Sequence, residues 1–206
     1  MRAFSIGAVV ATNLLIGLRY VSLLRRQRIQ PSLAMWVFFT IAVIGSLITY
    51  LAEGVYGLLD NILNTADLVL CGGVAIAIAI YGDRSTRFDR FDLGCLLAVV
   101  VILVIWAFTR QHVLAHAAVQ LILVIAYIPV IRRLWSAERN TESYVMWFGL
   151  MLAPIFSLFS SKGMLATVYA VRAIICTAML LLLMMRASVR ARRRTMSESS
   201  ECHDLA

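Results

Sequence analysis

The sequence predicts an all-α membrane protein with seven transmembrane helices. Of its 206 residues, 62% are apolar, and the mean hydropathy is +0.87, whereas an average soluble domain is nearer half apolar. The apolar residues form continuous blocks, close to the roughly 20 residues that cross a bilayer as a helix, rather than the alternating pattern of a β-barrel. Six spans is the alternative count, because two of the blocks are short. The blocks are 4–22, 33–52, 62–81, 93–109, 113–131, 145–161 and 164–185.

The basic residues predict which ends of these helices face the cytoplasm, because positively charged loops stay on the cytoplasmic side. One side of the predicted membrane carries only Arg2, Arg110 and Lys162. We therefore expect the N-terminus outside and the C-terminus inside. The net charge of +8 then reflects topology rather than nucleic-acid binding. The arginines on the cytoplasmic side are Arg25, Arg26, Arg28, Arg84, Arg87, Arg90, Arg132, Arg133, Arg139, Arg186, Arg190, Arg192, Arg193 and Arg194.

The first three blocks match the last three in residue order, which indicates an internal repeat. The gaps needed to align the two copies fall only between blocks, where a repeat tolerates them. The matched pairs are Asn13 and Gln120, Tyr20 and Tyr127, Arg25 and Arg132, Trp36 and Trp147, Ser46 and Ser157, Asn64 and Tyr169, Asp67 and Arg172, and Cys71 and Cys176.

The block at 93–109 has no partner and is interpreted as a linking helix. Three helices per copy would invert the second copy, and one extra helix restores its orientation. A 3+1+3 order therefore predicts parallel repeats related by an axis along the membrane normal. The predicted domains are 1–81, 82–111 and 112–186, followed by a polar tail at 187–206. We expect this tail to be disordered, with its arginines facing anionic lipid headgroups.

A local motif joins the fifth and sixth blocks. A tyrosine and a proline end one run, a basic pair and a short Asn-Thr-Glu-Ser loop follow, and a tryptophan opens the next run. The pattern resembles the PQ-loop motif of the superfamily that includes the SWEET sugar transporters and the PQ-loop amino-acid exporters. The resemblance extends from about residue 4 to 186, and it implies a transporter whose solute pocket lies between two three-helix bundles. The motif residues are Tyr127, Pro129, Arg132, Arg133, 140–143 and Trp147, with Val130 where the motif has glutamine.

Asp67 and Arg172 are the strongest candidates for function, because a charge at the centre of a membrane span costs about 3 kcal/mol on insertion scales. They occupy matched positions, so a pseudo-twofold axis would place them on opposite sides of one centre. Asn64 shares a helix face with Asp67, and Tyr169 shares one with Arg172. Together with the resemblance, this predicts that the four residues line a pocket for a polar or zwitterionic solute. The alternative is a structural ion pair that holds the bundles together.

Asn13 and Gln120 each place an amide in the middle of a span. Such an amide commonly hydrogen-bonds to a neighbouring helix, which is worth about 0.6–2 kcal/mol. Contact with a solute is the alternative, because His116, Gln120 and Tyr127 form one stripe along their helix. His112 and His116 are one turn apart and could share a metal ion, but no third ligand accompanies them. We expect no metal and no cofactor.

Aromatic residues and prolines are the candidates for a gate and for helix hinges. Trp36 and Trp147 open two apolar blocks at the cytoplasmic side, where they form either an interfacial aromatic belt or an inner gate. Pro129 and Pro154 free backbone carbonyls and permit kinks, so we expect hinges there, with Tyr127 beside the first of them.

The sequence therefore predicts a carrier of a small polar solute, such as a sugar, an amino acid or a nucleoside. It would work by alternating access around a central site, in the plasma (inner) membrane. A receptor or sensor without transport, and a membrane scaffold, are the alternatives on the same fold. No enzymatic motif is present in the sequence, so no enzyme is expected. The expected partners are the solute and anionic lipid, without nucleic acid, and a homo-oligomer is left open.

Overall fold

The structure is a computed structural model that describes residues 1–27, 29, 33–82, 90–128, 131, 134–135 and 144–204. Within these residues it is helical and contains no strand, which confirms the all-α prediction. Each predicted apolar block corresponds to one α-helix. The elements are α1 (Arg2–Arg25), α2 (Leu33–Leu51), the 3-10 helix η1 (Leu58–Asn61), α3 (Ile62–Tyr81), α4 (Arg90–Thr109), α5 (His112–Ile125), α7 (Tyr144–Ser157) and α8 (Gly163–Asp204).

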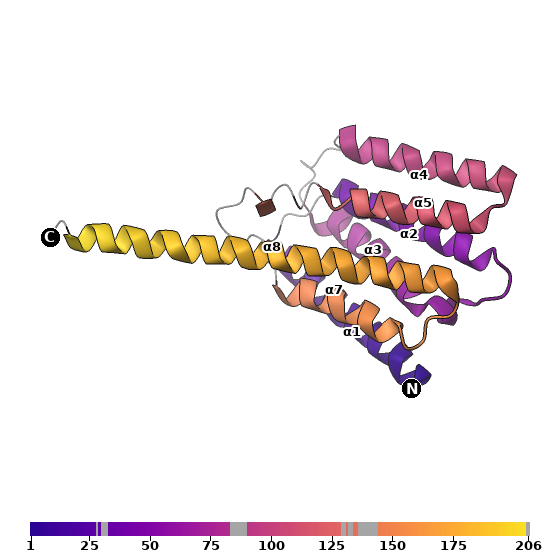
Figure 1. Cartoon of the computed structure of the whole chain (residues 1–206), viewed down its shortest axis with the longest axis horizontal. Coiled ribbons are helices and arrows are strands. Elements are labelled where there is room, and N and C mark those ends of the chain that lie inside the picture. Colours follow the sequence, from indigo (N-terminus) through magenta and orange to yellow (C-terminus); the bar gives the residue numbers. More distant parts are fainter. Residues whose placement is uncertain are drawn as a thin grey trace.

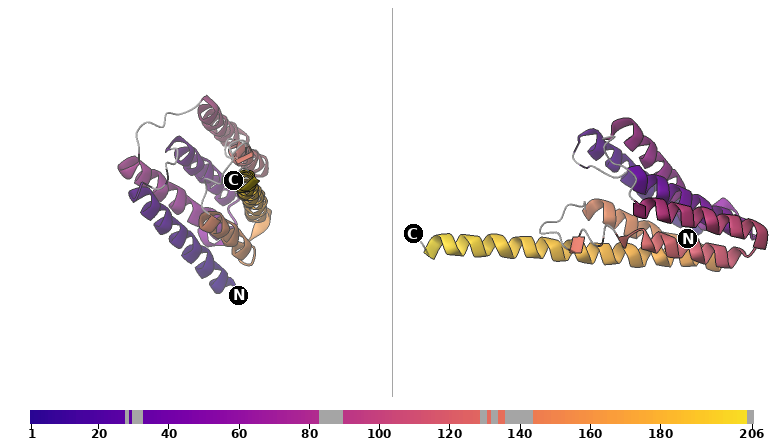
Figure 2. Two further views of the ribbon diagram at one scale, coloured as in Figure 1. Left: turned by 90° about the vertical axis from the view of Figure 1, so that its left-hand side faces the viewer. Right: turned by 90° about the horizontal axis from the view of Figure 1, so that it is seen from above.

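Two helices, α3 and α8, each pack between two others. In the first half of the chain, α3 lies between α1 and α2, and in the second half α8 lies between α5 and α7. The two halves of the chain meet along two seams, because α1 packs against α7 and α2 packs against α5. The linking helix α4 lies at the edge of the bundle, against α2 and α5 (Figures 1 and 2).

The helices run roughly along a common axis, so the bundle has two ends (Figure 1). The N-terminus lies at the end where α2 connects to α3, α4 to α5, and α7 to α8, and this end is called the N-terminal end below. The opposite end carries the far end of α1, the start of α2 and the C-terminal extension of α8.

The outward faces of the helices are apolar, as expected of a protein surrounded by lipid. Phe4, Val69 and Phe108 are 72%, 74% and 85% exposed. Within the described residues, three helices are long and apolar enough to cross a membrane, namely Arg2–Arg25, Leu58–Tyr81 and Gly163–Ala191. Four apolar helices are shorter: Trp36–Leu51, Leu93–Thr109, His112–Ile125 and Tyr144–Ser157. The chain is thus suited to association with a membrane.

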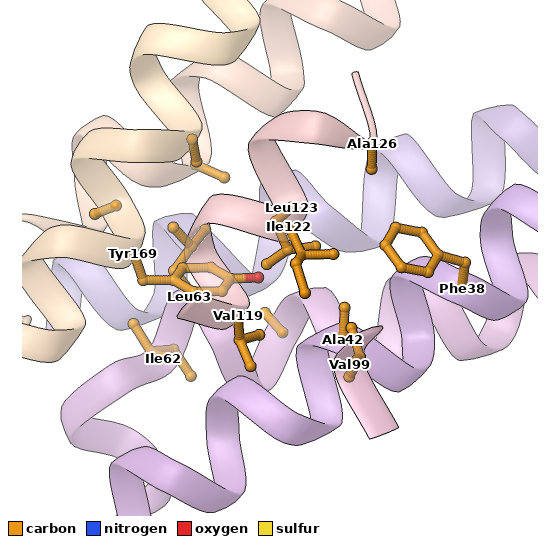
Figure 3. Close-up of a cluster of buried hydrophobic side chains, with 14 of the residues drawn as sticks. Phe38, Ala42, Ile62, Leu63, Val99, Val119, Ile122, Leu123, Ala126 and Tyr169 are labelled. Carbon is orange, nitrogen blue, oxygen red and sulfur yellow. The ribbon is translucent and has the colours of Figure 1, made fainter. Parts of the chain in front are cut away.

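The largest apolar core cluster joins both halves and the linking helix (Figure 3). Because lipid tails are as apolar as these side chains, close packing rather than removal from water must hold the helices together. Tyr169 projects from α8 into this cluster and is 1% exposed, so its hydroxyl reaches the interior of the bundle. Members from the other helices are Phe38, Ala42, Ile62, Leu63, Val99, Val119, Ile122 and Leu123.

Two helices in the second half are shorter than the predicted spans. α5 ends at Ile125, although the apolar block continues to residue 131, and α7 ends at Ser157 rather than 161. After the end of α5, Ile128 and Ile131 are again helical, and the Ile131 amide donates to the Tyr127 carbonyl at 2.9 Å. In α7, Pro154 lies inside the helix, and its ring nitrogen cannot donate a hydrogen bond to the preceding turn.

The C-terminal residues differ from the predicted disordered tail. α8 continues as a helix to Asp204 and projects beyond the bundle (Figure 1). An existing helix extends without a new nucleation cost, and Arg, Met and Glu are good helix formers. The first turns of the extension are also anchored to Trp135. The Arg186 guanidinium carbon lies 4.0 Å from the centre of the Trp135 ring, and Arg190 donates to the Trp135 carbonyl at 3.3 Å.

The seam between α1 and α7 depends on a close approach at Gly149. A Cβ atom added at this position would lie 2.7 Å from Ile16 Cδ1 and 2.7 Å from Ile16 Cγ1. Ile16 is 6% exposed, so it has little room to move away. Gly149 therefore sets the distance between these two helices.

Gly149→Ala is expected to destabilise the protein by about 1–3 kcal/mol, because the added methyl group overpacks this seam. The free energy of unfolding in lipid micelles measures the effect. Gly7→Ala is the matched control: it lies on α1 with open space around its Cβ position. It should be neutral or stabilising by up to about 1 kcal/mol, the helix-propensity difference. Equal effects of the two substitutions would contradict the close approach.

Candidate functional site

A network of polar side chains crosses the interior of the bundle. It is called the central polar network below, and it contains residues from α2, α3, α5 and α8. Most members are buried, with exposed fractions of 4% or less, whereas Asp67 and Arg172 are half-buried. An apolar bundle holds such groups only when they are hydrogen-bonded to one another. The members are Ser46, Thr49, Asn64, Asp67, His116, Gln120, Tyr169 and Arg172.

Tyr169 links the two charged residues of the network. Its hydroxyl donates to Asp67 Oδ2 at 2.9 Å, and the Arg172 guanidinium carbon lies 4.7 Å from the centre of its ring. Asp67 and Arg172 form no direct ion pair within 4.0 Å. In place of the ion pair considered as the alternative, a tyrosine bridge joins the two residues, combining a hydrogen bond with a cation–π contact.

The two charged groups keep unused hydrogen-bonding capacity. Among the described residues, Asp67 Oδ1 and the two terminal nitrogens of Arg172 have no hydrogen-bond partner. None of these three atoms is fully buried. A carboxylate can accept several hydrogen bonds and a guanidinium can donate five, so both groups can bind a further polar molecule.

Gln120 connects Arg172 to the first half of the chain. Arg172 Nε donates to Gln120 Oε1 at 2.8 Å, and Gln120 Nε2 donates to Ser46 Oγ at 2.8 Å. The amide of Asn64 and Ser46 Oγ lie 2.9 Å apart. In the amide orientation that satisfies both groups, the Ser46 hydroxyl donates to Asn64 Oδ1, and Asn64 Nδ2 donates to the Val43 carbonyl at 3.2 Å. The chain of bonds therefore runs from α8 through α5 and α2 to α3.

Asn13, the residue matched to Gln120 in the sequence, lies apart from this network and forms no hydrogen bond to a neighbouring described helix. Its Nδ2 donates to the Val9 carbonyl of its own helix at 3.2 Å. Asn13 is 5% exposed, and its Oδ1 has no hydrogen-bond partner among the described residues. Leaving a buried acceptor unpaired costs about 1–3 kcal/mol, so this atom favours a bound donor.

His112 and His116, one turn apart on α5, have different partners. His112 Nδ1 accepts a hydrogen bond from Trp106 Nε1 at 2.9 Å, whereas His116 contacts groups on α2 and α8. Within the described residues, no group of three or more His, Cys, Asp or Glu side chains has metal-site geometry.

Asp60 ties the two halves together at the N-terminal end. Its carboxylate forms ion pairs with Arg2 of α1 and with Lys162, whose Nζ lies 3.1 Å from Asp60 Oδ1. The Lys162 amide donates to the Asp60 carbonyl at 2.9 Å, and Tyr50 donates to the Lys162 carbonyl at 2.9 Å. Gly163, with a φ of +79°, then starts α8. Sequence reasoning missed Asp60, because a carboxylate near a helix end has no distinctive pattern.

Aromatic residues close the opposite end of the bundle. Tyr20 and Trp36 pair with ring centres 5.1 Å apart, and the Trp36 Nε1 donates to the Tyr20 hydroxyl at 2.9 Å. The matched residues Tyr127 and Trp147 also pair, with ring centres 6.4 Å apart. Phe39 of α2 contacts Tyr127 at 5.7 Å and so joins the two halves.

The predicted hinges are only partly described. Pro129 lies outside the described residues, as do Arg132, Arg133 and 140–143 of the predicted motif. Pro154 is buried in α7, where its carbonyl accepts from the Ser157 hydroxyl at 2.8 Å. Ser5 of α1 hydrogen-bonds to the Phe156 carbonyl and, at 2.8 Å, to Ser160 Oγ. The end of α7 after Pro154 is thus attached to α1.

A surface hollow lies away from the central polar network. It has a volume of about 470 Å³ and sits against the C-terminal part of α1. Its lining residues all come from this one helix and its end, so it does not bring the two halves together. They are Leu18, Val21, Ser22, Arg25 and Arg26.

Comparisons of the chain with protein-family models, with curated proteins and with solved structures find no match. The central polar network and the contacts at the two ends of the bundle are therefore the features from which a function can be inferred.

Tyr169→Phe is expected to lower the free energy of unfolding by about 1–3 kcal/mol, because Asp67 loses its hydrogen-bond donor. Chemical unfolding in lipid micelles measures this loss. In an Asp67→Ala background the same substitution should cost less, because the bond is already absent. Equal costs in the two backgrounds would mean that the tyrosine bridge contributes nothing to stability.

Proposed function

We propose that this chain is a seven-helix membrane carrier that moves a small polar solute by alternating access around the central polar network. The observation that carries the proposal is the separation of Asp67 and Arg172 by Tyr169. Opposite charges in an apolar bundle would be cheapest as a direct pair. Here each is held by hydrogen bonds or ring contact and keeps free bonding capacity, which suits a ligand that arrives between them.

The packing of the helices supports two repeats around this centre. Exchanging α1 with α5, α2 with α7 and α3 with α8 converts the α1–α7 seam into the α5–α2 seam. The middle helices α3 and α8, which carry Asp67 and Arg172, exchange with one another. This is the arrangement expected of parallel repeats related by an axis along the membrane normal.

A zwitterion matches the charges best. A primary ammonium group can bind Asp67 Oδ1, and a carboxylate can accept from the terminal nitrogens of Arg172 in the bidentate geometry that arginine favours. Neutral sugars or nucleosides would use the same hydrogen-bonding atoms without the charge complementarity.

The contacts at the two ends support alternating access. The Asp60 ion pairs and the Lys162 backbone bonds hold the halves together at the N-terminal end. The Phe39–Tyr127 contact holds them together at the opposite end. Opening one set of contacts at a time would expose the central polar network to one side of the membrane, which is the requirement of a rocking carrier.

The direct test is uptake of labelled solutes into proteoliposomes that contain the purified protein. Labelled alanine is expected to enter faster than into protein-free liposomes, and faster than glucose or uridine, because its two charges match Asp67 and Arg172. Arg172→Gln should abolish alanine uptake, whereas Arg110→Gln, at the surface between α4 and α5, should retain it. Absence of uptake for all three solutes would contradict the proposal and favour a receptor or a scaffold.

Asp60→Asn is expected to open the N-terminal end, because it removes the charge that binds Arg2 and Lys162. Cys71 and Cys176 are buried beside the charged centre, so a membrane-impermeant thiol reagent reports the opening. In a Cys95→Ser, Cys202→Ser background, the substitution should raise labelling from the N-terminal side several-fold.

Glu53→Gln is the control for this experiment. Glu53 lies at the same end and forms no ion pair with another described residue. Unchanged labelling in Asp60→Asn, or an equal rise in both variants, would contradict a gate at this end.

A further inference from the structure

His116 is fully buried where α2, α5 and α8 meet. It is 0% exposed and lies four residues before Gln120 on α5. Neither the tyrosine bridge nor the contacts at the two ends use it. The neighbours of its two ring nitrogens differ in a way that indicates a role.

The Nδ1 atom faces a carbonyl and a hydroxyl group. It lies 3.2 Å from the Ser46 carbonyl and 3.2 Å from Thr49 Oγ1. The Thr49 hydroxyl has the Gly45 and Ser46 carbonyls as acceptors, each at 3.0 Å, and the Ser46 carbonyl needs a donor at His116 Nδ1. Nδ1 must therefore carry a hydrogen whenever these contacts are satisfied.

The Nε2 atom faces one donor and one acceptor. Gln120 Nε2 lies at 3.3 Å and the Leu165 carbonyl of α8 at 3.1 Å. The orientation of the Gln120 amide is fixed, because its oxygen accepts from Arg172. Without a proton, His116 Nε2 accepts from Gln120, and with a proton it donates to Leu165. Both states of Nε2 therefore have a partner in place.

We propose that His116 Nε2 is a proton-binding site, and that its state is transmitted through Gln120 to Arg172 in the central polar network. This inference rests on the proposed transport function for its use, but the proton site itself can be tested separately. When Nε2 binds a proton, its N–H faces an N–H of Gln120. The repulsion displaces the Gln120 amide and weakens its bonds to Arg172 Nε and Ser46 Oγ. Proton binding thereby releases Arg172 Nε, so that it can bind a solute together with the two terminal nitrogens.

No described ionisable side chain on α2 or α3 lies against His116, so its proton is coupled to Arg172 rather than to another titrating group. On α2 it faces Ser46 and Thr49. Towards α3, Ser46 lies between it and Asn64. On α8 it faces the Leu165 backbone, and the charge that acts on it within the described residues is that of Arg172. A proton on His116 and the positive charge of Arg172 repel one another, so a solute carboxylate on Arg172 favours protonation. Linkage requires the converse, that protonation favours binding of the carboxylate.

The proton site is tested on the full-length protein in lipid nanodiscs by NMR of histidine labelled with 15N in the ring. The chain has three histidines, and His116→Gln identifies the His116 signals. As the pH is lowered from about 8 to below the range in which histidine usually titrates, Nε2 should change from an acceptor to an N–H while Nδ1 stays an N–H. The Gln120 amide signals should shift with the same midpoint. A His116 that stays neutral while the protein remains folded, or that titrates without a change at Gln120, would overturn the proposal.

Coupling is tested by accumulation of labelled alanine in proteoliposomes. With one proton per solute and no membrane potential, a pH difference of one unit supports about tenfold accumulation, because both correspond to the same 1.4 kcal/mol. Wild type should approach this value, and His116→Gln should show no accumulation above equilibration. His112→Gln, which alters a histidine one turn away that bonds to Trp106, should retain it.

The two experiments separate the two claims. If alanine enters but a proton gradient causes no accumulation in wild type, the carrier stands and the proton coupling is wrong. If no solute enters, the proposed transport function fails, and the NMR titration alone decides whether His116 is a proton site.

Discussion

The tyrosine bridge between Asp67 and Arg172 is the interaction on which the rest of the structure depends. Two charges inside an apolar helix bundle cost several kcal/mol unless each is compensated. A direct pair would compensate both and leave no reason for the polar side chains around them. Tyr169 instead satisfies one carboxylate oxygen and covers one face of the guanidinium. Arg172 then requires a further acceptor, which is Gln120, and Gln120 requires Ser46 and orients towards His116. The network of four helices follows from keeping the charges apart.

The same constraint explains why the two halves are alike in packing and unlike in polarity. In the proposed repeat, Asn13 occupies the place of Gln120, and Ser157 that of Ser46. Gln120 reaches across the α2–α5 seam to Ser46, whereas Asn13 is shorter by one methylene group and bonds within its own helix. The α1–α7 seam is held instead by the close approach at Gly149 and by Ser5 at the end of α7. One seam is therefore polar and adjustable, and the other is tightly packed.

The sequence was sufficient to predict the α-helices and to single out most residues of the central polar network, for identifiable reasons. Each described α-helix overlaps one apolar block, because length and hydropathy are local properties. Asp67 and Arg172 could be identified because charges are rare in apolar blocks. Asn64 and Tyr169 share a helix face with them, and Gln120 places an amide in the middle of a span. Ser46 and Thr49 could not be distinguished as members of the network, because small hydroxyl residues are common in packed helices and their partners depend on how α2 meets α5. The sequence predicts a disordered tail where the structure continues α8 to Asp204. A polar composition excludes a packed core but does not exclude a helix continued from a packed segment.

The charges of the central polar network also restrict what a coupled cycle can do electrically. A zwitterion between Asp67 and Arg172 adds no net charge, so its transfer across the membrane is indifferent to the membrane potential. A proton on His116 adds one positive charge to the loaded carrier. Moving one charge across the full potential is worth about 2.3 kcal/mol per 100 mV. The potential therefore acts on the step that carries proton and solute together and leaves the return of the empty carrier unaffected. In the proposed cycle, a potential negative on the cytoplasmic side would favour uptake, because the proton that releases Arg172 from Gln120 is also the charge on which the field acts.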